Sequence, residues 1–297
     1  TLETSHRAIY IPDQDGRMAK ADDLFYNNSS QIKVRKKTMC HKRIANAEAD
    51  KLGVKGLRKQ VLDEHSLGLG IPFGQSEKLS TRLRKLLNDY PFGDEVLKEL
   101  VQNADDAGAT EIHFILDTRH HASTGVFSDN WKELQGPALC VYNNKPFTKD
   151  DLQGIQNLGE GSKGNDPTKT GQYGVGFNCV YHITDTPTFL TNVEGTETFC
   201  VFDPNLKYVP GATLEMPGQM YERDKELCEE YPNVFEPYME DIFPVQNGTM
   251  FRLPLRTASQ AETSEISEKV VTKKTIEDLF EAFQKEIAEV LLFLNHL

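Results

Sequence analysis

The stretch Glu99-Leu-Val-Gln-Asn103-Ala-Asp-Asp106-Ala-Gly108 decides the fold of this chain. Its polar residues Glu99, Asn103 and Asp106 are four and three positions apart, so a helix places them in one stripe. Apolar residues fill the adjoining arc, namely Val96, Leu97, Leu100, Val101, Ala104 and Ala107. The stripe therefore borders a core-facing surface and can form the wall of a pocket.

The residue types in this stripe suit a site for a magnesium nucleotide. A hard cation prefers oxygen ligands such as the amide oxygen of Asn103, and the carboxylate of Glu99 can hold and deprotonate a water molecule. Taken alone, a polar row of this kind is more often a solvated helix face. The stripe becomes informative only through the motifs that accompany it.

The composition disfavours several classes of protein. The 297 residues include 33 Lys and Arg against 45 Asp and Glu, and the net charge of −12 disfavours nucleic acid as a partner. Five widely spaced cysteines without a Cys-x-x-Cys pair favour a cytoplasmic location over a disulfide framework or a zinc site. No leader and no long apolar run is found, so we expect no membrane insertion. Because the sequence begins with Thr1, we expect a soluble part of a longer protein.

The order of the expected elements predicts the fold class. A helix capped by Ser76 and ended by Pro91 precedes the helix of the polar stripe, which we expect to start at Asp94 and stop at Gly108. Strands are expected at 111–117, 138–142, 188–192, 197–202 and 249–255. This order predicts an α+β fold, a two-layer sandwich in which helices cover one face of a mixed sheet.

The remaining segments are assigned by composition. Residues 1–70 differ in pattern from the rest and form a separate N-terminal segment. Residues 221–238 predict an acidic helix followed by an aromatic loop, and 259–269 a mobile Ser/Glu-rich connector. The segment 275–297 predicts a final amphipathic helix that docks on another part of the protein.

Two further motifs complete the pattern. Thr170-Gly171-Gln-Tyr-Gly174-Val175-Gly176-Phe177 is a glycine-rich loop that opens into an apolar helix, and its backbone N–H groups can hold phosphates. Lys163 lies in a polar segment just before this loop, as in a lid over a nucleotide. Asn247-Gly248-Thr249 predicts a turn into a strand, with the Thr249 hydroxyl free to bind a ligand.

Together, in this order, the three segments resemble the ATP-binding domain that gyrases, the ninety-kilodalton heat-shock chaperones, histidine kinases and MutL proteins share, the GHKL or Bergerat fold. Further segments of the sequence resemble the large repeats of the sacsin family, including Tyr142-Asn-Asn-Lys-Pro-Phe-Thr148 and Tyr208-Val-Pro-Gly-Ala-Thr213. The resemblance covers 71–256, with 1–70 similar to the end of a preceding repeat unit and 257–297 forming the connector and last helix.

The resemblance implies roles for particular residues. Asn103 would bind Mg²⁺ through the phosphates of ATP and Glu99 would act as general base. The other implied nucleotide contacts are Asp106, Asn143, Asn144, Lys163 in the lid, Gly171, Gly174, Val175, Gly176 and Phe177 in the phosphate loop, and Thr249 in the adenine pocket. The implied partners are protein clients, other chaperones such as the seventy-kilodalton heat-shock system, and neighbouring repeats of the same chain.

The sequence departs from the superfamily where the adenine base would bind. The superfamily places Asp-x-Gly-x-Gly there, whereas this chain has Asn143-Asn144-Lys145-Pro146. A neutral acceptor in place of the carboxylate loses about 1 kcal/mol, and overpacking by larger residues costs about 1–3 kcal/mol. We therefore expect weak or absent binding of Mg-ATP and negligible hydrolysis by this chain alone.

Three functions stay open on the sequence alone. The first is a nucleotide-responsive chaperone module, and the second is a non-enzymatic scaffold or client-binding module. In the second, aromatic residues of the segment 221–243 would anchor a partner, namely Tyr231, Phe235, Tyr238 and Phe243, although packing on the parent domain explains them more simply. The third, a MutL-like DNA repair ATPase, is disfavoured by the acidic charge.

Overall fold

The computed structural model describes residues 9–28, 37–57, 77–156 and 176–297, and the chain forms two compact units, Thr1–Ser76 and Glu77–Leu297. The smaller unit contains an antiparallel pair, β1 (Tyr10–Pro12) and β2 (Met18–Lys20), and a parallel pair, β3 (Phe25–Tyr26) and β4 (Lys55–Gly56). The short helices η1 (Ala21–Asp23) and α1 (Asn46–Lys51) complete it. Its core comprises Ile11, Ala21, Leu24, Ala49 and Val54.

The larger unit is built on a six-stranded sheet in the order β5-β6-β10-β7-β8-β9. The strands are β5 (Ile112–Asp117), β6 (Ala138–Asn143), β7 (Thr188–Val193), β8 (Thr196–Phe202), β9 (Gly218–Glu222) and β10 (Thr249–Pro254). All neighbouring strands are antiparallel, so the expectation of a mixed sheet is wrong. A mixed sheet would contain at least one parallel pair, whereas β7 and β8 are antiparallel neighbours joined by the tight turn Glu194-Gly195.

Helices cover one face of this sheet. They are α3 (Leu79–Asp89), α4 (Glu95–Asp106), the 3-10 helix η3 (Gly176–His182) and α9 (Lys273–Leu291). The buried residues that they share with the strands include Leu83, Leu97, Leu139, Ile183, Phe189, Leu253, Ile276 and Leu279. α3 begins after Lys78, which gives no side-chain cap, and the expected cap Ser76 lies outside the described residues. A short helix, α5 (Lys149–Gly154), is closed by a capping box between Thr148 and Asp151.

A second core covers the opposite face, which the prediction of helices on one face did not include. It is formed by η2 (Asn130–Leu134), α6 (Lys225–Glu230), α7 (Pro232–Phe235), η4 (Glu236–Tyr238) and η5 (Val245–Asn247). The aromatic residues considered as possible partner anchors lie here: Phe235 and Tyr238 are buried, and Tyr231 and Phe243 are partly buried against the same core. They therefore stabilise the parent domain.

The acidic helix expected within 221–238 is present but short, and the aromatic segment expected as a loop after it contains two short helical turns. Tyr221 belongs to β9, and the helix begins only after Asp224, whose carboxylate accepts the N–H of Leu227 at 2.8 Å. Pro232 then starts a new short helix because proline at the first helical position lacks an N–H that the helix would leave unpaired.

The segment after β10 packs on the same unit in place of the expected mobile connector. Thr257 caps α8 (Ala258–Thr263) in a capping box with Gln260. The hydroxyl of Ser264 then accepts the N–H groups of Ile266 (3.0 Å) and Ser267 (3.1 Å), and Ile266 is buried in the core below the helices. These local hydrogen bonds order a stretch whose composition alone suggested disorder.

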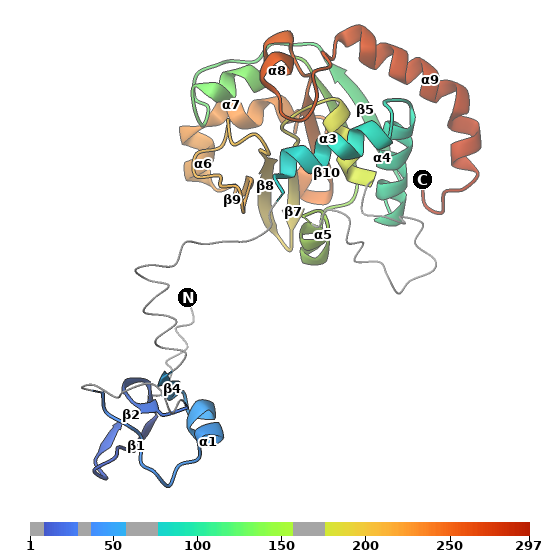
Figure 1. Ribbon diagram of the computed structural model, residues 1–297. Coiled ribbons are helices and arrows are strands. Elements are labelled where there is room, and N and C mark those ends of the chain that lie inside the picture. The colour runs from blue at the N-terminus through green and yellow to red at the C-terminus, as the bar shows by residue number, and fades with distance from the viewer. Residues whose placement is uncertain (1–8, 29–36, 58–76, 157–175) are drawn as a thin grey trace. The chain divides into compact units, whose positions relative to one another are not determined.

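The last helix docks as its apolar periodicity predicts. Ile276, Leu279 and Phe283 are buried, and Phe283 meets Phe114 of β5 edge-on. After α9 the chain returns to α4 (Figure 1), where the buried Asp105 carboxylate accepts the N–H groups of residues 295–297 at 2.6–3.1 Å. Burial raises the pKa of Asp105, but these backbone donors outweigh it and hold the pKa below its usual value.

Asp105→Asn is expected to lower the free energy of unfolding by about 1–3 kcal/mol, because an amide nitrogen cannot accept these N–H groups. The stabilisation by Asp105 is fully present above the carboxyl pKa of the unfolded chain, about 3.9, and is lost as the pH falls through the lower pKa of the folded state. Urea unfolding at pH 7 and at pH 3 measures both effects. The exposed Asp89→Asn is the control, and equal unfolding curves for the two variants would contradict the assignment.

Candidate functional site

The polar stripe lies on α4, as the sequence predicts. The apolar arc faces the core, with Val96, Leu97, Leu100, Val101 and Ala104 all buried. Glu99 and Asp106 are half-buried at the border, and Asn103 is exposed. Asp94 precedes the helix without a side-chain cap and pairs with Lys98 at 2.7 Å, while Gly108 ends it with a φ of +76° that suits glycine.

The structure brings the end of the glycine-rich loop onto this stripe. Gly176 packs so closely on Glu99 that a Cβ at this position would overlap the carboxylate oxygen Oε2, and it would lie 3.8 Å from Nδ2 of Asn103. A larger residue here would push the Glu99 carboxylate aside, so glycine permits the close approach. The thiol of Cys179, one turn on, has its pKa raised by burial and by the negative charge of Glu99, which places that carboxylate beside η3.

Other parts of the loop motif fall outside the described residues, namely Lys163, Gly171, Gly174 and Val175. The apolar helix that we expected after the loop is present as a 3-10 helix of seven residues. Phe177 lies in it and packs against Phe251 of β10 and Phe202 of β8, with ring centroids 5.6 and 5.8 Å apart. Its side chain therefore contributes to the core between η3 and the sheet.

The predicted adenine contacts lie in one row across the sheet. Asn143 of β6 is paired with Thr249 of β10, and Thr249 with Thr191 of β7. The Thr249 hydroxyl is fully buried, 2.7 Å from the Thr191 hydroxyl and 2.8 Å from the carbonyl oxygen of Lys145. It is thus engaged within the protein, not free for a ligand as we had expected.

The two asparagines of the predicted adenine site also have internal partners. The Oδ1 atom of Asn143 accepts the N–H of Lys145 at 3.0 Å. The Oδ1 atom of Asn144 accepts the N–H groups of Thr110 (2.9 Å) and Glu111 (3.2 Å), and its Nδ2 donates to the Thr110 hydroxyl. These bonds tie the segment to the loop that follows α4, so both amides shape the backbone here.

Phenylalanine rings pack on the same face of the sheet, next to this row. Phe147 packs on Phe189 and Phe251, with ring centroids 5.0 and 6.0 Å apart, and Phe189 in turn contacts Phe202 and Phe251. The N–H of Phe147 donates to the Thr191 hydroxyl at 3.0 Å and fixes its position. A cavity of about 420 Å³ lies elsewhere, lined in part by Asp185, and neither Glu99 nor Asn103 lines it.

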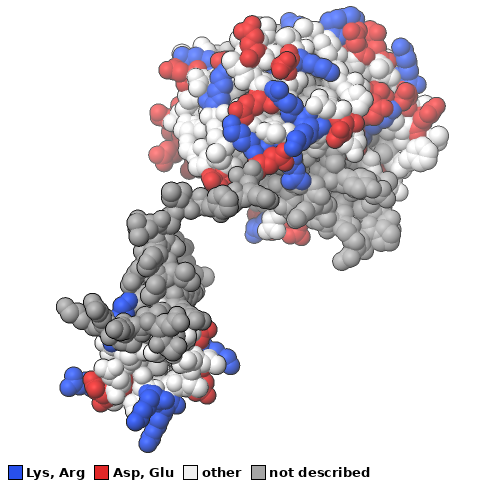
Figure 2. Space-filling model, in the orientation of Figure 1, with Lys and Arg blue, Asp and Glu red and all other residues white. Residues whose placement is uncertain are grey.

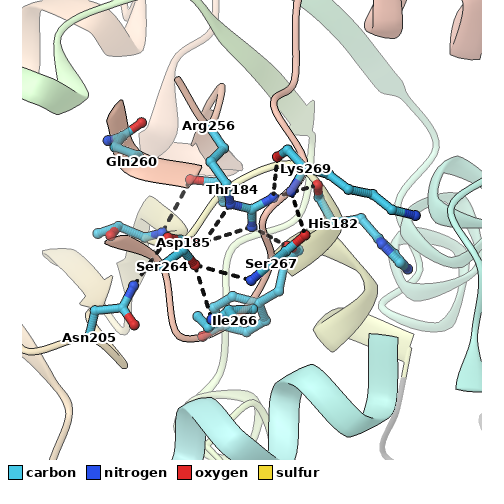
Figure 3. A network of polar contacts seen from close by, with 12 residues as sticks. His182, Thr184, Asp185, Asn205, Arg256, Gln260, Ser264, Ile266, Ser267 and Lys269 are labelled. Carbon is cyan, nitrogen blue, oxygen red and sulfur yellow. Dashed lines mark hydrogen bonds and ion pairs between the residues drawn. The ribbon is translucent and has the colours of Figure 1, made fainter. Parts of the chain in front are cut away.

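Sequence reasoning missed a buried ionic network behind η3 (Figure 3). The guanidinium of Arg256 is fully buried and donates to the Asp185 carboxylate at 2.7 Å and to the carbonyl oxygens of Tyr181, His182 and Lys269. Asp185 also accepts from Asn205 at 3.1 Å. An arginine just after a strand gives no sequence signal of burial, because its partners are carbonyl groups of distant segments.

The network joins three segments that are distant in the sequence. Arg256 follows β10, Asp185 and the carbonyl groups of Tyr181 and His182 belong to the end of η3 and the turn after it, and Lys269 precedes α9. Because η3 carries Gly176, the network fixes the element that contacts Glu99.

Comparison with known proteins decides the family. A family model described as Sacsin domain matches residues 76–297, which coincide with the larger compact unit. The chain belongs to the sacsin family. Its sequence is 45% identical to human sacsin (Homo sapiens) over 303 aligned residues, which cover 99% of this chain. The chain spans about 7% of the length of human sacsin.

The family membership confirms the resemblance to sacsin repeats that the sequence motifs indicated. In this sacsin domain the fold is α+β, with a six-stranded antiparallel sheet and several helices. No helix among the described residues is both long and apolar enough to cross a bilayer.

Proposed function

We propose that this chain is a GHKL-type module of a sacsin-like cytoplasmic chaperone or co-chaperone, with a degenerate adenine site and weak or absent ATP binding. The observation that carries the proposal is the packing of Gly176 on Glu99 and Asn103. It joins the end of a glycine-rich loop to an acid–amide stripe on a helix, and such a combination supplies the backbone N–H groups and oxygen ligands that a Mg-phosphate site can use.

The residues present fit the phosphate side of Mg-ATP better than its base. The exposed amide of Asn103 can bind Mg²⁺, and the Glu99 carboxylate can orient water. The groups assigned to the base, Asn143 and Thr249, are bonded within the protein, and the N–H of Phe147 binds the Thr191 hydroxyl, which is itself bonded to Thr249. Because a base would have to displace these contacts, its binding is expected to be weak.

Titration of Mg-ATP into the chain by calorimetry tests this proposal. We expect dissociation constants near or above 1 mM, and no difference between the wild type, Asn103→Ala and the control Gln102→Ala on the same helix. Steady-state phosphate release is expected to equal that of buffer. A micromolar affinity that Asn103→Ala abolishes and Gln102→Ala retains would overturn the degenerate-site proposal.

A purely non-enzymatic scaffold or client-binding module is the second candidate. It is favoured by the internal hydrogen bonds of Thr249, with which a ligand would have to compete for the hydroxyl. Under this proposal the partners are protein clients, other chaperones and neighbouring repeats of the same chain. Pull-down of these partners that is insensitive to ATP and to Asn103→Ala would favour the scaffold over the nucleotide-responsive module.

A further inference from the structure

The outer strand of the sheet is open on one side. Among the described residues β9 (Gly218–Glu222) pairs with β8 alone, and it lies at the margin of the larger unit in Figure 1. An unpaired strand edge presents N–H and C=O groups to an incoming extended chain. Such edges are normally shielded by charges on the strand or by a covering segment. The sequence Gly-Gln-Met-Tyr-Glu of β9 contains one charged residue, Glu222.

Large apolar side chains are exposed on this strand and just before it. Leu214, Met216 and Met220 are 60, 66 and 58% exposed. Met220 is in register with Cys200, so it is on the helix-covered face of the sheet but beyond the helices. Met216 is at the end of a tight turn, where its N–H donates to the Thr213 hydroxyl at 3.2 Å. Clusters of exposed methionine and leucine are typical of adaptable binding surfaces.

The sequence around β9 and these exposed side chains is strongly acidic. Residues 214–243 contain nine Asp and Glu against two basic residues, a net charge of −7 out of −12 for the whole chain. Both basic residues are paired: Arg223 with Glu197 and Glu240, and Lys225 with Glu229. Acidic side chains lie along this margin in Figure 2. The potential near β9 therefore favours a cationic partner.

We propose that β9, with Leu214, Met216 and Met220, is a docking strip for an extended peptide in which apolar residues alternate with lysine or arginine. The peptide adds as a further strand to the open edge, its apolar side chains contact the two methionines, and its basic side chains meet the acidic surroundings. This inference goes beyond the proposed function and is independent of nucleotide binding.

The charge also argues against a second copy of this chain as the occupant. Pairing of two β9 edges would bring two segments of net charge −7 together, which is repulsive at short range. A basic peptide removes this repulsion and provides the same backbone hydrogen bonds. The occupant is thus a strand of opposite charge.

The test uses the full chain and a fluorescein-labelled ten-residue peptide of alternating valine and lysine, followed by fluorescence anisotropy at low salt. We expect saturable binding that weakens at least tenfold in the double variant Met216→Gln/Met220→Thr. The control Leu292→Gln, which alters a 79% exposed residue at the end of α9, should bind as the wild type does. Circular dichroism and thermal unfolding verify that all variants fold.

Two control peptides separate strand addition from charge attraction. A serine and lysine peptide of the same charge, and a valine and lysine peptide N-methylated at alternate residues, should each bind at least tenfold more weakly. Equal binding of either peptide, equal binding to the double variant, or no binding to the wild type would overturn the proposal. A dimer of the chain alone in sedimentation velocity that Met220→Thr abolishes would also overturn it.

Discussion

Arg256→Met is expected to lower the free energy of unfolding of the larger unit by about 3–5 kcal/mol. The guanidinium is fully buried, so its removal leaves the Asp185 carboxylate charged in a low-dielectric interior and several carbonyl oxygens without a donor. Chemical unfolding monitored by circular dichroism measures the loss. The same variant should loosen η3, which hydrogen exchange of residues 176–183 reports.

A double-mutant cycle isolates the ionic pair. Asp185→Asn together with Arg256→Met should cost less than the sum of the two single changes, because the uncompensated charge is then absent. Lys274→Met removes an exposed pair with Asp278 and serves as a control with a much smaller effect. A loss for Arg256→Met no larger than that control would contradict a structural role for the network.

Phe189→Ala is expected to lower the free energy of unfolding by about 3–5 kcal/mol, because it leaves a cavity in the aromatic core between the sheet and the helices. Phe189 is completely buried, and the ring centroids of Phe147 and Phe251 lie 5.0 and 5.2 Å from its own. Urea unfolding measures the change. Phe293→Ala, at a residue that is 84% exposed, is the matched control and should have little effect.

A loss of unfolding free energy somewhat below this range would show that the neighbouring rings move into the cavity left by Phe189→Ala. A loss below about 1 kcal/mol would contradict the packing described, since typical phenylalanine truncations in cores cost several times more. Because these rings lie beside Thr249 and Asn143, a variant that leaves the cavity open should also bind Mg-ATP more tightly than the wild type. Comparing the Mg-ATP affinities of the variant and the wild type therefore tests whether packing of these rings prevents the adenine base from binding.

Sequence periodicity predicted the helices and strands whose buried apolar residues are regularly spaced. α4 and α9 follow an apolar arc, and β5, β6, β7, β8 and β10 are apolar strands bounded by turns. It failed at β9 and α8. Gly218-Gln-Met-Tyr-Glu222 has little apolar character and becomes a strand by pairing with β8, while α8 depends on the capping box of Thr257. Both elements are stabilised by neighbours that a local pattern does not contain.

In the candidate site, too, local spacing was predicted from the sequence and contacts between distant residues were not. The spacing of Glu99, Asn103 and Asp106 placed them on one stripe of α4, and the structure adds Gly176 directly beside the first two. The expected free hydroxyl of Thr249 was wrong because its partners, Thr191 and the carbonyl of Lys145, are 58 and 104 residues away in the chain. Hydrogen bonds between such distant residues have no signature in the sequence.

The sequence by itself determined the sacsin-type motifs, the α+β class and the stripe on α4, because each depends on residue order and local periodicity. Only the tertiary structure decided that the sheet is antiparallel, that Arg256 is buried on Asp185, and that rings such as Phe147 fill the space beside Thr249. The physical reason is that burial and hydrogen-bond satisfaction are properties of contacts between distant segments. Such contacts exist only when the chain has folded.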